Sequence, residues 1–163
     1  MIREILTAPH PVLAQVAKPV EDVAQVQTLI DDMLDTLYAT ENGIGLAAPQ
    51  VGESLAVVVI DLSEDQNDPL ILINPSIDEG DGSAVGPEAC LSIPGYSADV
   101  ERYAQVTVNA LDRDGNPISV TRDDFLAVVM QHEIDHLKGT LFIDHLSVLK
   151  RNMALKKVKK MRR

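Results

Sequence analysis

Residues 131–139 read Gln-His-Glu-Ile-Asp-His-Leu-Lys-Gly, and this stretch decides how the rest of the chain is interpreted. Its two histidines, His132 and His136, are four residues apart, so on a helix they lie on the same face. Their imidazoles can bind one metal ion, and the carboxylate of Glu133 can reach a water at that metal without being a ligand. Five-residue patterns also recur by chance, so the competing interpretation is a helix with two surface histidines and a solvated acid.

The residues before this stretch favour a metal site. Apolar side chains recur at helical spacing over 125–129, and the two histidines continue that apolar face, so we expect them to point inward. Thr121 and Asp124 resemble a capping box at the start of the helix, and Gly139 suits its C-terminal cap. A buried pair of imidazoles without a partner is costly, which favours a metal or a carboxylate between them.

A catalytic zinc-type site needs a third protein ligand and an open fourth position. In the extended histidine pattern the third histidine comes six residues after the second, where this chain has Phe142. A glutamate on a later helix is excluded as well, because no acidic residue follows Asp144. The nearby candidates are Asp144 and His145; otherwise the third ligand comes from upstream.

Cys90 is the only cysteine of the chain. Its thiolate is a soft ligand that suits Zn²⁺ or Fe²⁺. The alternatives are a buried cysteine that behaves as a small apolar residue, and a nucleophile activated by a neighbouring histidine. Composition alone leaves these three interpretations open.

Three separate blocks of sequence resemble the bacterial peptide deformylases in content, order and spacing. They are Gly-Ile-Gly-Leu-Ala-Ala-Pro-Gln-Val-Gly at 43–52, Glu-Ala-Cys-Leu-Ser-Ile-Pro at 88–94 and Gln-His-Glu-Ile-Asp-His-Leu-Lys-Gly at 131–139. The resemblance implies that Cys90, His132 and His136 bind one divalent metal, with water in the fourth position. It also implies that this metal is usually Fe²⁺, for which Zn²⁺, Ni²⁺ or Co²⁺ can substitute.

The resemblance further implies a reaction and the groups that carry it out. The substrate is a nascent polypeptide that begins with N-formylmethionine, and the products are formate and a free amino terminus. Glu133 is expected to act as the general base and then as the general acid toward the leaving amine. The side-chain amide of Gln50 and the backbone N–H of Leu91 are expected to stabilise the oxyanion.

Substrate binding is expected at Ile44, Gly45, Ala89, Val128 and Val129. By resemblance, the peptide pairs its backbone with Ile44 and Gly45 as an added strand. Val128 and Val129 lie one turn before the first histidine, so we expect them to wall an apolar methionine pocket. The same spacing equally suits plain helix core.

Two residues depart from the family pattern. Ala89 stands in the place of a glycine, and Ser97 stands where close bacterial relatives often carry a basic residue that helps to hold the substrate backbone. Glycine supplies backbone freedom or permits a close approach, so a methyl group there can hinder the peptide. We expect activity to remain, reduced or altered in substrate preference.

At 163 residues the chain is long enough for a sizeable core, and we expect a single catalytic domain over 1–163. The longest apolar runs, 55–60 and 125–130, are too short to cross a membrane, and the first residues lack the features of a signal or transit peptide. One cysteine excludes an intramolecular disulfide, and a metal thiolate favours reducing conditions. We therefore expect a cytoplasmic protein with no membrane partner.

Charge is strongly segregated along the chain. The tail at 150–163 holds eight of the fourteen basic residues and none of the twenty-five acidic ones, so the remainder has a formal charge of −19. Such a body repels nucleic acid, and we expect no DNA partner, whereas the tail attracts it. We expect a helical tail, either as a solvated helix end or, as the resemblance implies, in contact with the ribosome near the exit tunnel.

The periodicity of the remaining residues predicts an α+β fold. A helix is expected over 23–37, ending near Asn42-Gly43, with strands over 55–62 and 70–77 and an interruption or end of the second at Asn74-Pro75. Alternation at 106–110 and the Asp114-Gly115 turn predict a hairpin with 118–120. We expect antiparallel or mixed sheets packed around the metal helix, with a further helix near each end of the chain.

Two other functions fit parts of the sequence. A zincin-like metallopeptidase would use the two helix histidines together with His145 or Asp144. A catalytically weakened deformylase paralogue that binds peptides or the ribosome is suggested by the two departures from the family pattern. The presence of Glu133 argues against the paralogue, because a binding module does not need a general base.

Overall fold

The computed structural model describes residues 1–161; Arg162 and Arg163 of the basic tail lie outside the described residues. The helices are α1 (Gln27–Ala39), α2 (Phe125–Leu137) and α3 (Val148–Met161), with short 3-10 helices η1 (Pro11–Ala14), η2 (Val23–Val26), η3 (Ala48–Val51) and η4 (Phe142–His145). The strands are β1 (Gly45–Ala47), β2 (Val57–Ile60), β3 (Leu70–Asp81), β4 (Ala84–Cys90), β5 (Ile93–Arg102), β6 (Gln105–Leu111) and β7 (Pro117–Arg122). The predicted α+β class is confirmed.

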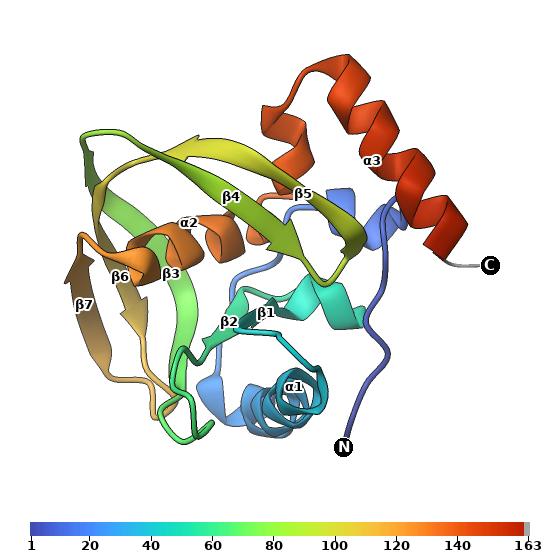
Figure 1. Ribbon diagram of the computed structural model, residues 1–163. Coiled ribbons are helices and arrows are strands. Elements are labelled where there is room, and N and C mark those ends of the chain that lie inside the picture. The colour runs from blue at the N-terminus through green and yellow to red at the C-terminus, as the bar shows by residue number, and fades with distance from the viewer. Residues whose placement is uncertain (162–163) are drawn as a thin grey trace.

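The strands form two antiparallel sheets. One sheet has the order β1-β2-β3-β6-β7, and β4 and β5 form a separate two-stranded hairpin. Helix α2 lies between the larger sheet and the β4–β5 hairpin, whereas α1 covers the other face of the larger sheet (Figure 1). Within residues 1–161, no helix is long and apolar enough to cross a membrane.

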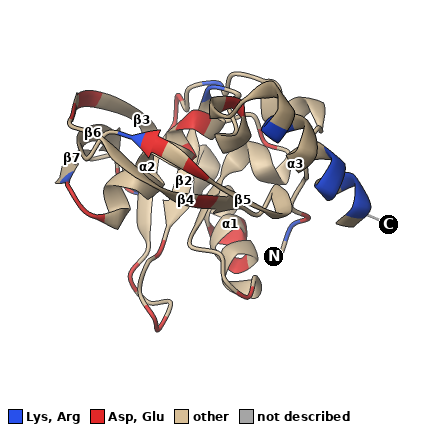
Figure 2. Ribbon diagram, turned by 45° about the horizontal axis from the view of Figure 1, so that its top comes forward, with Lys and Arg blue, Asp and Glu red and all other residues tan. Residues whose placement is uncertain are grey.

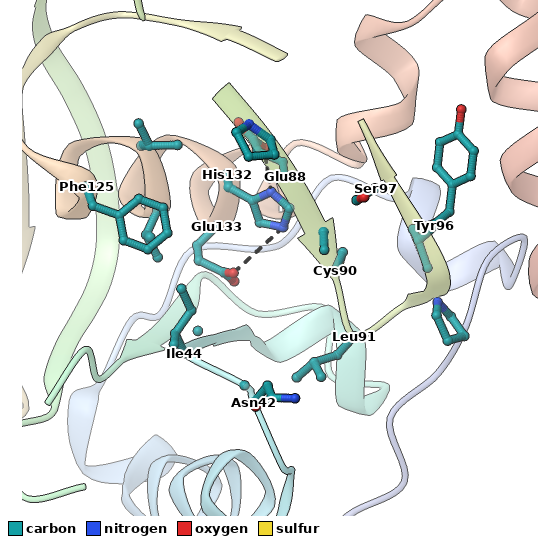
Figure 3. Close-up of a pocket in the computed structure, with 18 of the residues that line it drawn as sticks. Asn42, Ile44, Glu88, Cys90, Leu91, Tyr96, Ser97, Phe125, His132 and Glu133 are labelled. Atoms are coloured by element: carbon teal, nitrogen blue, oxygen red, sulfur yellow. Dashed lines mark hydrogen bonds and ion pairs between the residues drawn. The ribbon is translucent and has the colours of Figure 1, made fainter. Parts of the chain in front are cut away.

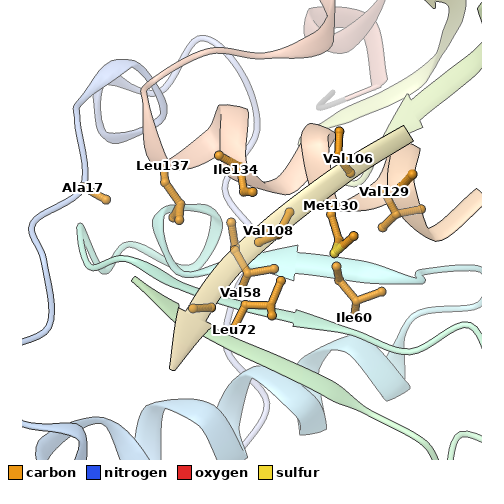
Figure 4. Close-up of a cluster of buried hydrophobic side chains, with 13 residues drawn as sticks. Ala17, Val58, Ile60, Leu72, Val106, Val108, Val129, Met130, Ile134 and Leu137 are labelled. Atoms are coloured by element: carbon orange, nitrogen blue, oxygen red, sulfur yellow. The ribbon is translucent and has the colours of Figure 1, made fainter. Parts of the chain in front are cut away.

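Strand β2 shows how the two faces of the larger sheet are divided. All four of its residues are buried, because helices cover both faces. Val58 and Ile60 belong to the same core cluster as Met130 and Ile134 of α2 (Figure 4). Val57 and Val59 instead pack in the cluster that contains residues of α1. This division is expected, because side chains alternate between the two faces along a strand. The apolar face of α2 is therefore anchored in the sheet.

The C-terminal segment packs on the β4–β5 hairpin. Phe142 and Ile143 of η4 and Ala154 and Val158 of α3 form a third core cluster with residues of β5. Phe142 is 1% exposed, so the position of the missing third histidine is a core position in this chain. The lysines and the arginine of α3 face outward, and Figure 2 shows this concentration of basic residues on α3.

Several predicted boundaries require correction. The helix predicted over 23–37 is divided into η2 and α1, and it ends at Ala39 rather than near Asn42-Gly43. The reason is Thr40, whose Oγ1 donates to the carbonyl of Leu37 and accepts a hydrogen bond from the N–H of Gly43. The strand predicted over 55–62 shortens to β2.

The strand predicted over 70–77 continues to Asp81 as β3. It passes through an irregularity after Ile73, where Asn74 has a φ of 52°. The Asn74 side chain accepts from the N–H of Val20 and donates to the carbonyl of Val20, at 2.8 and 2.9 Å. These bonds hold the strand to the N-terminal segment at the bulge, so Asn74 bends the strand without ending it.

The helix predicted before Gly139 is confirmed as α2, but its predicted capping box is wrong. Thr121 lies in β7, and Asp124 is the N-cap residue without a side-chain cap hydrogen bond. The Asp124 carboxylate instead pairs with Arg122. The predicted hairpin is confirmed as β6 and β7, and Gly115 in its turn has a φ of 87°.

The β4–β5 hairpin was not predicted from the sequence. Two of its inward-facing residues, Glu88 and Arg102, are charged and yet each is only 7% exposed. Three outward-facing residues of β5 are Ser97, Asp99 and Glu101. Apolar and polar residues alternate over 96–101 of β5, but β4 shows no such alternation, so the pairing of the two strands is not evident from the sequence.

Candidate active site

The predicted ligand residues meet between the β4–β5 hairpin and α2. Cys90 ends β4, and His132 and His136 lie one turn apart on α2. Their ligand atoms all lie within 4.8 Å of one another, and Cys90 Sγ is 3.3 Å from His136 Nε2. One thiolate and two imidazoles are a donor set that suits Fe²⁺ or Zn²⁺.

The other two candidate ligands lie elsewhere. Asp144 accepts hydrogen bonds from the N–H of Leu141 and from Arg151 Nε, each at 2.8 Å. His145 Nε2 is 2.9 Å from Asp135 Oδ2. Neither residue belongs to the cluster of ligand atoms. The geometry therefore favours the upstream cysteine over both.

Cys90 faces the helix because it lies two residues after Glu88, on the same face of β4. The regular register of the hairpin ends at Ala89, which pairs with Ser97, and Cys90 then pairs with Ile93 across the turn. Figure 3 shows Cys90 beside His132, on the side of the hairpin that faces α2.

Gln50 of η3 is buried beside Cys90. Its Oε1 accepts a hydrogen bond from the N–H of Ala47 at 3.0 Å, and its Nε2 lies 3.1 Å from Ser92 Oγ and 3.5 Å from Cys90 Sγ. The amide is thus fixed with its donor directed toward the cluster. Leu91 follows the cysteine directly and lines the same pocket.

His132 is oriented by a residue that sequence reasoning did not assign. Glu88 Oε1 lies 2.9 Å from His132 Nδ1, so Nδ1 donates to the carboxylate and Nε2 is left for a ligand. Arg102 binds Glu88 through two bonds of 2.8 Å each. Burial alone would raise the pKa of Glu88, but the bonds from Arg102 and His132 outweigh it and lower the pKa to about 2. Glu88 is therefore an anion at neutral pH.

The same arginine connects the hairpin to the outer side of α2. Arg102 Nη1 donates to Asp135 Oδ2 at 2.5 Å, and Asp135 also contacts His145. Glu88 and Asp135 lie within two of the three sequence blocks that carry the family resemblance, which is the signal that could have identified them. No local pattern pairs them with Arg102, because the network joins residues far apart in the chain.

Glu133 is buried on the same helix with one oxygen unpaired. Its Oε2 has no hydrogen-bond partner among the described residues, and its Oε1 is 3.9 Å from His132 Nε2. Burial raises the pKa of Glu133 to about 7, which places it in the range suited to proton transfer. Gly45 leaves room for this carboxylate, because a Cβ there would lie 3.0 Å from Glu133 Oε1.

The residues fit a divalent metal on two independent grounds. The ligand atoms converge from two elements, and the unpaired carboxylate oxygen of Glu133 fits a water held at the cluster. Burial also lowers the pKa of His136, which favours the neutral imidazole that binds metals.

A pocket of about 660 Å³ lies in front of the cluster. All five predicted substrate-binding residues line it, namely Ile44, Gly45, Ala89, Val128 and Val129. Sequence reasoning did not assign Phe125 and Tyr96, which also line it (Figure 3). Phe125 precedes Val128 by three residues, so helical spacing could have identified it. Val129 also belongs to the core cluster, so both of its predicted roles are compatible with its position.

The two departures from the family pattern lie opposite each other. Ala89 and Ser97 are directly paired across β4 and β5, and both line the pocket. They therefore form a single rung of the hairpin at the pocket wall, close to Cys90.

The family model described as polypeptide deformylase matches residues 2–152. The chain is similar to peptide deformylase 2 of Vibrio parahaemolyticus, with 64% identity over 159 residues that cover 98% of this chain and 95% of the relative. It is also similar to peptide deformylase 3 of Shewanella oneidensis, with 55% identity and 98% of each chain covered.

Solved structures agree with the sequence relatives. The peptide deformylase of Legionella pneumophila superposes with a TM-score of 0.95 at 47% identity, covering 99% of this chain and 96% of that one. The Ehrlichia chaffeensis peptide deformylase in complex with actinonin gives a TM-score of 0.94 at 37% identity, covering 99% and 98%. The chain therefore belongs to the peptide deformylase family.

Proposed function

We propose that the site formed by Cys90, His132, His136 and Glu133 removes the formyl group from nascent polypeptides that begin with N-formylmethionine. The family to which the chain belongs is metal-dependent and acts on formylated nascent peptides. The observation that carries the assignment of the site is the unpaired carboxylate oxygen of Glu133 beside the Cys/His/His cluster, within one pocket.

The chemistry follows from the groups around the pocket. A divalent metal held by the cysteine and the two histidines supplies a Lewis acid and an activated water. Glu133 takes a proton from the attacking water and passes it to the nitrogen of the leaving amine. Gln50 Nε2 and the backbone N–H of Leu91 donate hydrogen bonds to the oxyanion of the tetrahedral intermediate. The C–N bond breaks, and formate and the free amine leave.

The substrate is held by the wall residues of the pocket. The methionine side chain enters the apolar part formed by Val128, Val129 and Ile44, and the peptide backbone lies along Ile44 and Gly45 as an added strand. Ala89 lines the opposite wall of the pocket, where its side chain adds one methyl group beside this backbone. This placement is supported by the position of all these residues in the pocket lining.

Fe²⁺ is the proposed metal, with Zn²⁺, Ni²⁺ and Co²⁺ as substitutes. A mixed thiolate and imidazole donor set supports this choice, because calcium and magnesium prefer oxygen ligands. A thiolate ligand is vulnerable to oxidation, which favours a reducing compartment. The proposed substrate emerges from the ribosome, which favours the compartment where proteins are synthesised. We therefore propose a cytoplasmic location, and we propose that residues 1–163 contain a single catalytic domain.

The deciding experiment is formate release from formyl-Met-Ala-Ser, after anaerobic purification and with metal analysis of the same sample. We expect turnover that tracks one divalent metal per chain. Release equal to a metal-free background would contradict the proposal. Cys90→Ser separates it from a zincin-like peptidase, because the peptidase would keep metal and activity without the thiol, whereas the proposed site loses both or is strongly altered.

Helix α3 supports a second proposal, that the basic tail contacts ribosomal RNA or protein near the exit tunnel. Six of its cationic side chains are exposed, at Lys150, Arg151, Lys156, Lys157, Lys159 and Lys160. Exposed cations on one helix favour a phosphate-rich surface.

Neutralising four of these cations tests the contact more sharply than truncation. Ala154 and Val158 of α3 are fully buried, so removing the helix would also damage the core. Glutamine at 156, 157, 159 and 160 keeps those buried residues. We expect this variant to lose co-sedimentation with ribosomes at low salt while formate release from the short peptide continues. Unchanged co-sedimentation would contradict the contact.

A further inference from the structure

The exposed face of the β4–β5 hairpin continues the pocket wall outward. Ser97 lines the pocket, and Asp99 and Glu101 follow at intervals of two residues in the same strand, so the three side chains share one face. The residue opposite Asp99 is Pro87, which also lines the pocket. A peptide that leaves the pocket along this face therefore meets Asp99 next after Ser97.

Basic groups do not offset these two carboxylates. None of the residues that line the pocket is a lysine or an arginine. Arg102 is buried on the opposite face of the hairpin and is bound to Glu88 and Asp135. Within residues 1–161, Asp99 forms no ion pair, and Glu101 accepts a single side-chain hydrogen bond, from Ser83 Oγ at 2.7 Å.

The surroundings reinforce the negative sign. Residues 1–149 carry a formal charge of −19, and the compensating cations are concentrated on α3 (Figure 2), which packs on Tyr96, Ala98 and Val100, the face of β5 opposite Asp99. A peptide that enters this pocket therefore approaches through a negative potential on the side of the hairpin.

We propose that Asp99, assisted by Glu101, selects nascent chains by charge, so that lysine or arginine after the formylmethionine is preferred over aspartate or glutamate. This inference rests on the proposed deformylase function. Two residues of strand advance about 6.6 Å, so Asp99 lies within one Debye length, about 8 Å at physiological salt, of a peptide beside Ser97.

The preference acts on binding rather than on the chemical step. Asp99 is remote from the ligand cluster and does not contact the reacting atoms, so its effect is equal in the ground state and the transition state. Such uniform binding changes KM and leaves kcat constant. Exposed charge pairs are weak, so we expect a difference of about two- to fivefold between peptides of opposite charge.

The experiment compares formyl-Met-Ala-Lys, formyl-Met-Ala-Gln and formyl-Met-Ala-Glu under one set of conditions. We expect kcat/KM to fall in that order because KM rises while kcat stays constant. At high salt, we expect the differences in kcat/KM between the peptides to shrink. Asp99→Asn should shrink the ratio of the lysine to the glutamate peptide, and Asp99→Lys should invert it. Asp114→Asn is the matched control, because it removes the same charge from the β6–β7 turn, outside the pocket lining.

The outcomes separate this inference from the proposed function. If the neutral peptide releases no formate above the metal-free background, the deformylase assignment of the site fails. If the neutral peptide is processed but the lysine-to-glutamate ratio is the same in the wild type and Asp99→Lys, charge selection by Asp99 is overturned. An equal change in Asp114→Asn would also overturn it, because the effect would then come from net charge alone.

Discussion

We call the metal-ligand cluster with Glu133, Glu88 and Arg102 the floor of the pocket, and we call Ala89, Ser97 and Asp99 its rim. The two regions differ in how firmly their polar groups are held. In the floor, Glu88 and Arg102 are buried and doubly bonded, and they fix the ring of His132. On the rim, Ser97 and Asp99 are exposed side chains without a hydrogen-bond or ion-pair partner within residues 1–161. We propose that the floor determines which reaction occurs, whereas the rim influences which peptide is bound. Substitutions should therefore have effects of very different size in the two regions.

The largest effect is expected in the floor, for Glu133→Gln. The amide cannot accept the proton of the attacking water, so formate release should fall by about a thousandfold. Metal content should remain the same, because Glu133 is not one of the clustered ligand residues. Formate assays with metal analysis and thermal unfolding check this. If the variant kept a tenth of the activity at full metal content, another group would be the base.

Glu88→Gln tests the support of a ligand rather than the ligand itself. The substitution weakens the bond to His132 Nδ1 and leaves the buried Arg102 with less compensating charge, so metal affinity should fall about 10- to 100-fold. Competition with a chelator measures this, and excess metal should restore part of the activity. Glu101→Gln makes the same chemical change on the exposed face of the neighbouring strand, and metal affinity should not move. Equal affinities in both variants would remove the distinction between floor and rim.

Gly45→Ala places a methyl group at the boundary between the two regions. Its Cβ would lie 3.0 Å from Glu133 Oε1, so the carboxylate has to shift. Small misplacements of a catalytic group are costly, and we expect kcat to fall about tenfold with metal retained. Gly86→Ala is the matched control, since a Cβ there meets nothing within 4 Å. A similar loss in both variants would point to a general strand effect.

The smallest effect is expected on the rim, for Ala89→Gly. Ala89 is an exposed residue of β4 that lines the pocket. Glycine within a strand lowers the free energy of unfolding by about 0.5–1 kcal/mol, and removal of the methyl group should improve KM for formyl-Met-Ala-Ser without changing kcat. Denaturant unfolding and steady-state kinetics measure the two terms. A large change in kcat would place Ala89 functionally in the floor.

Local periodicity was sufficient for some elements and insufficient for others. The metal helix and the β6–β7 hairpin repeat apolar residues at regular spacing, and both were predicted. The β4–β5 hairpin was missed because β4 lacks the alternation that β5 shows over 96–101, and because Glu88 and Arg102 point inward as an ion pair that only the folded chain brings together. The predicted capping box is wrong because Thr121 lies in β7 and the Asp124 carboxylate pairs with Arg122.

The candidate site divides in the same way. The helical spacing of His132 and His136 could be read from the sequence, since both lie on one element. The convergence of Cys90 with them depends on the packing of the β4–β5 hairpin against α2, and it was suggested by family resemblance rather than by any local pattern. Asp99 carried no signal, because an exposed acid in a strand is an ordinary solvated residue until the pocket beside it is known.

The position of Cys90 also has a practical consequence. It is the only cysteine in the chain, and its sulfur lies against His136 at the centre of the cluster. An alkylating reagent therefore has a single thiol to modify, and a metal bound there would protect it. The fraction of protein that gains one label in a mass spectrum would count empty centres directly, molecule by molecule, without any turnover being measured.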